Sequence, residues 1–165
     1  MPHRTTEPLR PHPKMPWGTV VLCGAGAGFL GVAAMTASEK IEQFFTGRAN
    51  SYVPARTLAR LIGVTVRSGP GDNDSSLWRL NMAMHYGQGI VVGVARSIMG
   101  YNGITGPFAD VMFAGLRLAV DQTLENWTGV KALPWTWPFG EQVIDLVHKF
   151  VYAIATGYFS DLWMY

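Results

Sequence analysis

The chain has 165 residues, which fits one domain, and its 48% hydrophobic and 15% charged residues make it apolar for a soluble protein. Its formal net charge of +2 is small and its Lys and Arg residues are dispersed, which argues against a nucleic-acid-binding surface. The single cysteine, Cys23, excludes an internal disulfide, so nothing indicates an oxidising compartment. The mean hydropathy is only +0.14 because a polar tail and a polar central loop dilute the apolar segments.

The first apolar segment follows a basic, proline-rich stretch, residues 1–16, that has no apolar periodicity and is predicted to be a disordered tail. Residues 17–37 carry no charge, and this length matches the roughly 20 residues that a helix needs to cross the hydrocarbon core. A cleaved signal peptide is the alternative, because small residues near Ala34 and Ala37 fit a cleavage site loosely. Gly24, Gly28 and Gly31 favour a membrane span, since such a stripe lets another helix approach closely in lipid.

A long and mostly polar connection precedes the second apolar segment. The first helix is predicted to continue through Phe45 and to stop at Gly47. Within the loop of residues 47–77, residues 54–62 predict a short helix, which either lies on the membrane surface or is an ordinary solvated loop helix. Residues 68–76 are typical of a flexible connector.

Three further apolar segments, about residues 77–99, 107–127 and 139–163, are each long enough to cross a membrane as a helix. All six tryptophans fall at the ends of predicted spans, where membrane proteins place them at the level of the headgroups. The sequence therefore predicts an all-α fold, a membrane-embedded four-helix bundle of residues 17–165 with spans at about 17–37, 79–99, 107–126 and 139–161. A soluble helical bundle with an unusually apolar core is the alternative.

Polar residues in the last three segments recur at i, i+4, i+7, i+11 and i+15, so they share one face of each helix. In lipid, such faces must turn toward one another or toward a water-filled cavity. Within the spans, only Lys149 departs from this pattern. The positions on the three faces are Asn81, His85, Gln88, Val92 and Arg96; Asp110, Ala114, Arg117, Asp121 and Glu125; and Glu141, Asp145, His148, Tyr152 and Thr156.

A glycine-rich turn around Gly103 joins the second and third spans and predicts a helical hairpin. Folding the hairpin brings polar residues to matching depths and predicts a ladder of four complementary rungs. In the rung nearest the turn, Arg96 and Asp110 are expected to form a structural ion pair that fixes the register. The other rungs pair Gln88 with Arg117, His85 with Asp121, and Asn81 with Glu125.

Five residues at similar predicted depths form the densest polar group, and we call them the inner cluster: His85, Arg117, Asp121, Asp145 and His148. They either hold the helices in register or perform chemistry. His148 oriented by Asp145 suits a general acid or base. Tyr152, one turn further, could donate a hydrogen bond to a developing oxyanion, and Arg117 could stabilise charge.

Two cofactor interpretations fit the inner cluster poorly. A haem iron between His85 and His148 would have to bridge predicted depths that differ by about 6 Å at the helical rise. Together with Asp121 and Asp145 the two histidines form no tight metal-ligand motif. We therefore expect neither a cofactor nor a metal.

Several short motifs occur in the apolar segments, namely the run Gly24-Ala25-Gly26-Ala27-Gly28, Met35-Thr36, His85-Tyr86-Gly87, and His148 with Tyr152 and Gly157. In these motifs the chain resembles the small four-span YagU-like membrane proteins. The resemblance covers the four spans and implies their topology, but it implies no activity.

The orientation is predicted from basic residues near the span ends. The loops after the first and third spans hold Lys40, Arg48, Arg56, Arg60, Arg67, Arg79 and Lys131, whereas the other side holds Arg4, Arg10 and Lys14. This bias places both loops in the cytoplasm or matrix and both termini across the membrane.

Three functions remain open on the sequence alone. The first is a membrane accessory or structural protein whose polar ladder specifies helix pairing. The second is an intramembrane isomerase or cyclase that acts on a lipophilic substrate, and the third is a proton or solute pathway through the inner cluster. The expected partners are the lipid bilayer and either other membrane proteins or a lipophilic small molecule, with no nucleic acid. An interior pocket would favour the enzyme, a wet path the transporter, and a filled interior the accessory protein.

Overall fold

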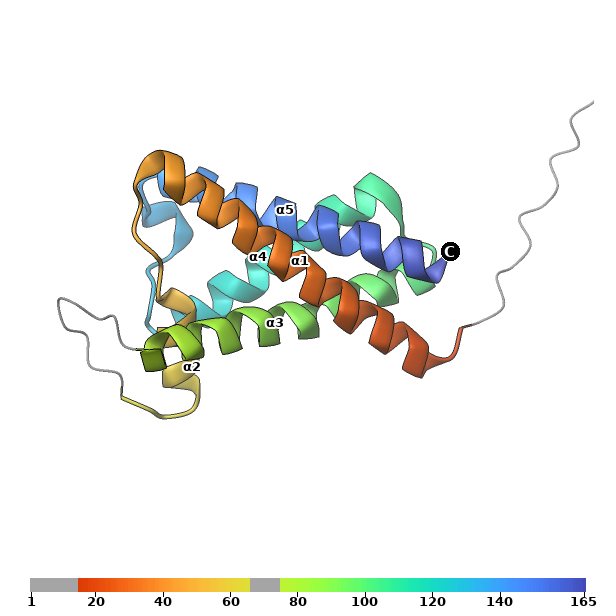
Figure 1. The fold of residues 1–165 in the computed structure, drawn as a ribbon, viewed down its shortest axis with the longest axis horizontal. Coiled ribbons are helices and arrows are strands. Elements are labelled where there is room, and N and C mark those ends of the chain that lie inside the picture. The colour runs from red at the N-terminus through yellow and green to blue at the C-terminus, as the bar shows by residue number, and fades with distance from the viewer. Residues whose placement is uncertain (1–14, 66–74) are drawn as a thin grey trace, which may run out of the picture.

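The computed structural model describes residues 15–65 and 75–165, and these residues are all helical apart from their connections (Figure 1). The all-α prediction is therefore confirmed for the described part of the chain. The predictions for the tail and for most of the central connector fall on residues 1–14 and 66–74, outside this part. The elements in order are α1 (Trp17–Thr46), α2 (Val53–Leu61), α3 (Ser75–Tyr101), α4 (Gly106–Trp127), the 3-10 helix η1 (Pro134–Thr136) and α5 (Phe139–Met164).

Helix α1 begins directly after Pro16 and ends where Gly47 takes a left-handed conformation, with φ of +69°. The Gly47 N–H donates to the carbonyl of Gln43, which satisfies a carbonyl that the helix end leaves without an intrahelical partner. By length and composition, α1 is the one helix in the described residues that could cross a membrane. A buried core helix or a signal sequence would meet the same criterion.

Helix α1 packs most extensively against α3 and α5, and Figure 1 shows it lying along both. Glycines on both helices allow the close contact between α1 and α3. A Cβ atom on Gly93 would lie 2.5 Å from the Gly24 carbonyl oxygen and 2.6 Å from the Gly28 Cα. Two residues of the predicted glycine stripe, Gly24 and Gly28, therefore meet Gly89 and Gly93 of α3, whereas the third, Gly31, faces Tyr152 and Thr156 of α5.

Among the described residues, one of the four predicted rungs between α3 and α4 forms an ion pair. Arg96 contacts Asp110 across the turn, but the two helices touch sparsely elsewhere, because α1 occupies the close-packing face of α3. In the described residues, Asn81 instead accepts a hydrogen bond from the backbone N–H of Ala55 in α2. Helix α4 packs mainly against α5, so a hollow is left between α3, α4 and α5.

The core lies halfway along the long helices. Its buried residues are Val32, Met35, Val92, Phe113, Ala114, Tyr152 and Ala153. The Tyr152 ring stacks on Phe113 with centroids 5.5 Å apart, and its hydroxyl donates to the Gly89 carbonyl at 2.6 Å. Ser97 and Ser160 share a buried hydrogen bond of 2.9 Å, so α3 and α5 are joined by polar contacts as well as by packing.

The tryptophans lie near the two ends of the helix assembly. Trp17 and Trp163 lie near the start of α1 and the end of α5, and the others lie near the opposite end. Five are well exposed, but Trp137 is buried because its indole N–H donates to the Ala132 carbonyl and Lys131 covers its ring. Trp137 therefore serves the fold of the α4–α5 connection rather than an outer surface.

Candidate functional site

A cavity of about 300 Å³ lies at the end of the molecule where α1 and α4 end and α3 and α5 begin. Helix α2 contributes Val53, Pro54 and Thr57 to its wall. Ionisable side chains dominate the rest of the lining: Glu39, Arg48, His85, Arg117, Asp121, Glu125, Lys131, Glu141, Asp145, His148 and Lys149. All five residues of the inner cluster are thus brought to one cavity.

Lys149 lies off the predicted polar face of α5, but its side chain reaches the cavity. It is only 9% exposed, and its ammonium lies 2.5 Å from Asp121 and 3.6 Å from Asp145. Asp145 precedes Lys149 by one helical turn, which puts both residues on the cavity side of α5. The long aliphatic stem then carries the ammonium to Asp121 on α4, so Lys149 joins the inner cluster.

Arg117 is buried, with 1% of its surface exposed, and its guanidinium lies over the Tyr152 ring at 4.9 Å from the centroid. Its Nε lies 3.1 Å from Asp121, but it is not aligned for a hydrogen bond, so this contact is electrostatic. Asp121 therefore lies between two cations, Arg117 and Lys149. Because opposite charges alternate in this group, the buried ionisable side chains compensate one another.

Several buried polar atoms around the cavity have no hydrogen-bond partner among the described residues. A buried donor or acceptor without a partner costs about 1 to 3 kcal/mol, so proteins rarely gather several in one place. Here they come from α2, α3, α4 and α5 and belong to residues that line the same cavity. These atoms are Thr57 Oγ1, His85 Nε2, Gln88 Nε2, Arg117 Nε and Nη1, Asp121 Oδ1 and His148 Nε2.

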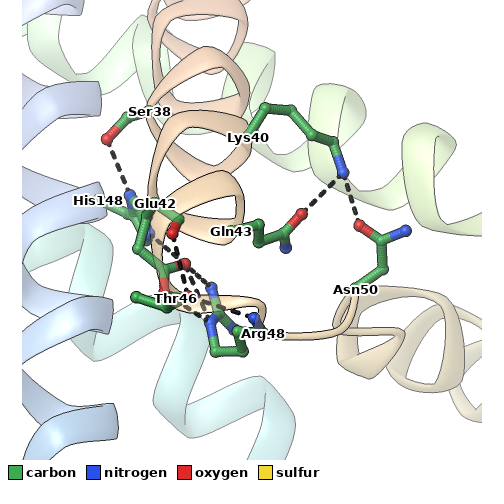
Figure 2. A network of polar contacts seen from close by, with 8 residues as sticks. All are labelled: Ser38, Lys40, Glu42, Gln43, Thr46, Arg48, Asn50 and His148. Atoms are coloured by element: carbon green, nitrogen blue, oxygen red, sulfur yellow. Dashed lines mark hydrogen bonds and ion pairs between the residues drawn. The ribbon is translucent and has the colours of Figure 1, made fainter.

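His148 is held by α1 rather than by Asp145. Its Nδ1 lies 3.0 Å from the Ser38 hydroxyl, and its Nε2 lies 3.8 Å from Glu42, as Figure 2 shows. The expected acid–base pair of Asp145 with His148 is not formed, because Asp145 contacts Lys149 instead. Tyr152 is also engaged, since its hydroxyl donates to Gly89.

Arg48, just beyond the end of α1, anchors the mouth of the cavity to that helix. Its guanidinium donates to both carboxylate oxygens of Glu42, with the shortest bond at 2.7 Å (Figure 2). These hydrogen bonds raise the pKa of Arg48 above its usual value, so this side chain keeps its charge. The same Glu42 lies beside His148, which links the cavity mouth to α5.

We expect Arg48→Gln to lower the free energy of unfolding by only about 0.5 kcal/mol, because the pair is partly exposed and screened by solvent. Thermal unfolding of the purified protein in detergent measures this change. Arg56→Gln, at an exposed position on α2, is the control. A loss of several kcal/mol at Arg48 would contradict the expectation and show that the mouth of the cavity holds the fold together.

At the opposite end of the molecule, Arg96 is completely buried and contacts two carboxylates. Its Nη2 lies 3.1 Å from Asp110 and 2.9 Å from Asp161, and Asp161 also accepts a hydrogen bond from the Gly106 N–H. The pair with Asp110 is the predicted structural ion pair. Asp161 was missed because it does not fall on the helical face traced through Glu141 to Thr156.

In the residues that the structure describes, no group of three or more His, Cys, Asp or Glu side chains is placed to hold a metal ion. No protein-family model matches the chain, and neither a curated protein nor a solved structure matches it. The YagU-like resemblance therefore stays a prediction, and the functional proposal has to rest on the chemistry of the cavity.

Proposed function

We propose that the chain is a multi-pass membrane protein whose four long helices enclose a ligand-binding cavity that opens at one membrane interface. One observation carries this proposal, namely the group of buried polar atoms without protein partners around a single cavity. A structural network would satisfy these atoms internally, because each unsatisfied atom costs stability. Residues that line a cavity and carry such unpartnered atoms are suited to bind a polar ligand.

The membrane location is supported by the outward faces of the helices. Large apolar side chains are exposed along all four long helices, among them Leu22, Val91, Phe108, Val111, Val147 and Ile154. The ionisable groups that line the cavity lie inside this apolar outer surface, which is the pattern expected in lipid. Basic residues are concentrated at the end of the molecule where the cavity lies, and this favours a cavity that faces the cytoplasm or matrix.

An enzymatic role is the natural extension of this proposal, as an isomerase or cyclase that acts by general acid–base catalysis. The best-placed titratable group is His85, which is 7% exposed, lines the cavity and has a free Nε2 among the described residues. An imidazole of this kind can exchange a proton with a bound substrate. A solute pathway is less well supported, because the stacked rings of Phe113 and Tyr152 lie beyond Arg117 and close the inner end.

The accessory or structural function is the second candidate, and the other half of the molecule favours it. There the polar groups satisfy one another across helices, as Arg96 does with two carboxylates and Ser97 with Ser160. This half supplies stability and helix pairing. Among the described residues, this half holds no comparable set of unpartnered polar atoms around a cavity.

The test removes polar side-chain atoms that belong to cavity-lining residues and have no hydrogen-bond partner among the described residues. We expect Gln88→Leu and Thr57→Val to leave the free energy of unfolding unchanged or to raise it by about 1 kcal/mol, because each removes a buried polar atom without stranding a partner. We expect the same variants to lose small molecules that co-purify with the wild type, as detected by native mass spectrometry of the full chain.

Thr123→Val, at an exposed position on α4, is the matched control and should retain them. Equal retention by all variants would contradict a ligand-binding cavity. A marked loss of stability in Gln88→Leu would instead indicate that the amide has a structural role.

A further inference from the structure

A second hollow, of about 250 Å³, lies between α4 and α5 next to the polar cavity. Its lining is largely apolar and includes Leu118 on α4, Val143 and Leu146 on α5, and the Trp137 ring. Val143 is 40% exposed and Leu146 is 42% exposed, so the hollow is open to the outside of the helix assembly. We call it the α4–α5 groove.

The groove and the polar cavity meet at Asp145, which lines both. One side of this residue therefore faces buried charged and polar groups, and the other faces aliphatic side chains on the outer surface. A single molecule that filled both hollows would need a polar part and an apolar part joined near Asp145. This is the description of an amphiphile.

The charges of the polar cavity limit the headgroup. Its lining carries five carboxylates, Glu39, Asp121, Glu125, Glu141 and Asp145, and four cations, Arg48, Arg117, Lys131 and Lys149. No surplus of cations is available to neutralise an anionic group, and burying an uncompensated charge is costly. Arg117 and Asp121 nevertheless both line this cavity, and among the described residues each carries an unpartnered polar atom, a donor in Arg117 and an acceptor in Asp121.

We propose that the two hollows bind one amphiphile, with a headgroup of no net charge in the polar cavity and its hydrocarbon chain in the α4–α5 groove. This inference rests on the proposed function, since it assumes that the polar cavity is a ligand site. The headgroup both donates and accepts hydrogen bonds, as a zwitterion or a polyhydroxylated group does. The hydrocarbon chain of the amphiphile lies on the outer surface of α4 and α5, where it stays in contact with surrounding lipid.

The experiment titrates the full-length protein in detergent with three probes that share one saturated chain, namely a monoacylglycerol, a lysophosphatidylethanolamine and a lysophosphatidylglycerol. Native mass spectrometry measures the apparent dissociation constants. We expect the uncharged and zwitterionic probes to bind about tenfold more tightly than the anionic one. Glycerophosphoethanolamine, which has no chain, should bind at least about tenfold more weakly than its lysolipid.

Leu146→Trp fills the groove and should weaken binding of the favoured probe by about tenfold. Val147→Trp is the matched control, because Val147 is exposed on the same helix but lines neither hollow. Val143→Trp blocks the groove from a second position, so a folding defect in one variant does not decide the result. Both blocking substitutions lie on the outer surface, and neither removes a polar contact.

Tightest binding of the anionic probe, or no binding of any probe, would overturn the inference. Leu146→Trp, Val143→Trp and Val147→Trp could all bind the probe equally well while Gln88→Leu binds it more weakly. The hydrocarbon chain of the probe then does not lie in the groove, although the polar cavity remains a ligand site. If Gln88→Leu also binds like the wild type, both the inference and the proposed function fail. A distinct loss in both groove variants together with a loss in Gln88→Leu supports both.

Discussion

Asp110→Asn and Asp161→Asn together are expected to lower the free energy of unfolding by about 3 to 5 kcal/mol, more than the sum of the single changes. Arg96 is completely buried, and these two carboxylates are its ion-pair partners in the described residues. Each single substitution leaves one carboxylate in place, so we expect each to cost about 1 to 2 kcal/mol. The double variant buries a cation without any counter-charge.

The reverse substitution, Arg96→Met, should cost less than the double variant, because Asp110 and Asp161 keep 17% and 27% of their side-chain surface exposed to solvent. Combining Arg96→Met with both asparagines removes every charge of the group and should recover much of the lost stability. Chemical unfolding in detergent measures the series, with Glu141→Gln at an exposed position as the control. Additive losses for the two aspartates would show that they do not share Arg96.

The elements of this fold were predictable because their signals are local. The uncharged stretch from Trp17, the stop at Gly47 and the turn around Gly103 mark helix ends through composition and backbone conformation. The direction of the polar faces was also predictable, because charged groups at one helical phase avoid an apolar surrounding. Neither inference requires knowing which helices are neighbours.

The pairing of the helices was not predictable in this way. A hairpin folded about Gly103 predicts that α3 and α4 pack along their length, since consecutive helices joined by a short turn are usually adjacent. The glycines of α1 and α3 instead allow a backbone contact that α4, with larger side chains on its inner face, does not match. Among the described residues, no hydrogen bond or ion pair joins the members of the other three predicted rungs, and part of the space between the helices is a cavity.

The site was predictable in its residues but not in its contacts. Helical phase placed His85, Arg117 and Asp121 around a common interior, and all three line the cavity. Phase does not decide which of two neighbours a carboxylate prefers, so Asp145 was assigned to His148 although it contacts Lys149. The true partners of His148, Ser38 and Glu42, belong to α1, more than 100 positions earlier in the chain.

The contact between α1 and α3 leads to the second large expected effect. We expect Gly93→Ala to lower the free energy of unfolding by about 1 to 3 kcal/mol, because the new methyl group would meet backbone atoms of Gly24 and Gly28 that cannot rotate away. Gly87→Ala is the matched control on the same helix, since a Cβ atom there meets nothing within 4 Å. That change should be neutral or stabilise the helix by about 0.5 to 1 kcal/mol.

Thermal or chemical unfolding in detergent distinguishes the two alanines by the sign of their effects. Gly93→Ala should also disturb the cavity, because a shift of α1 away from α3 carries Ser38 and Glu42 with it and weakens their hold on His148. We therefore expect Gly93→Ala, but not Gly87→Ala, to lose co-purified ligand together with stability. If both alanines had the same small effect, the backbone contact would not determine how α1 packs, and the cavity would not depend on it.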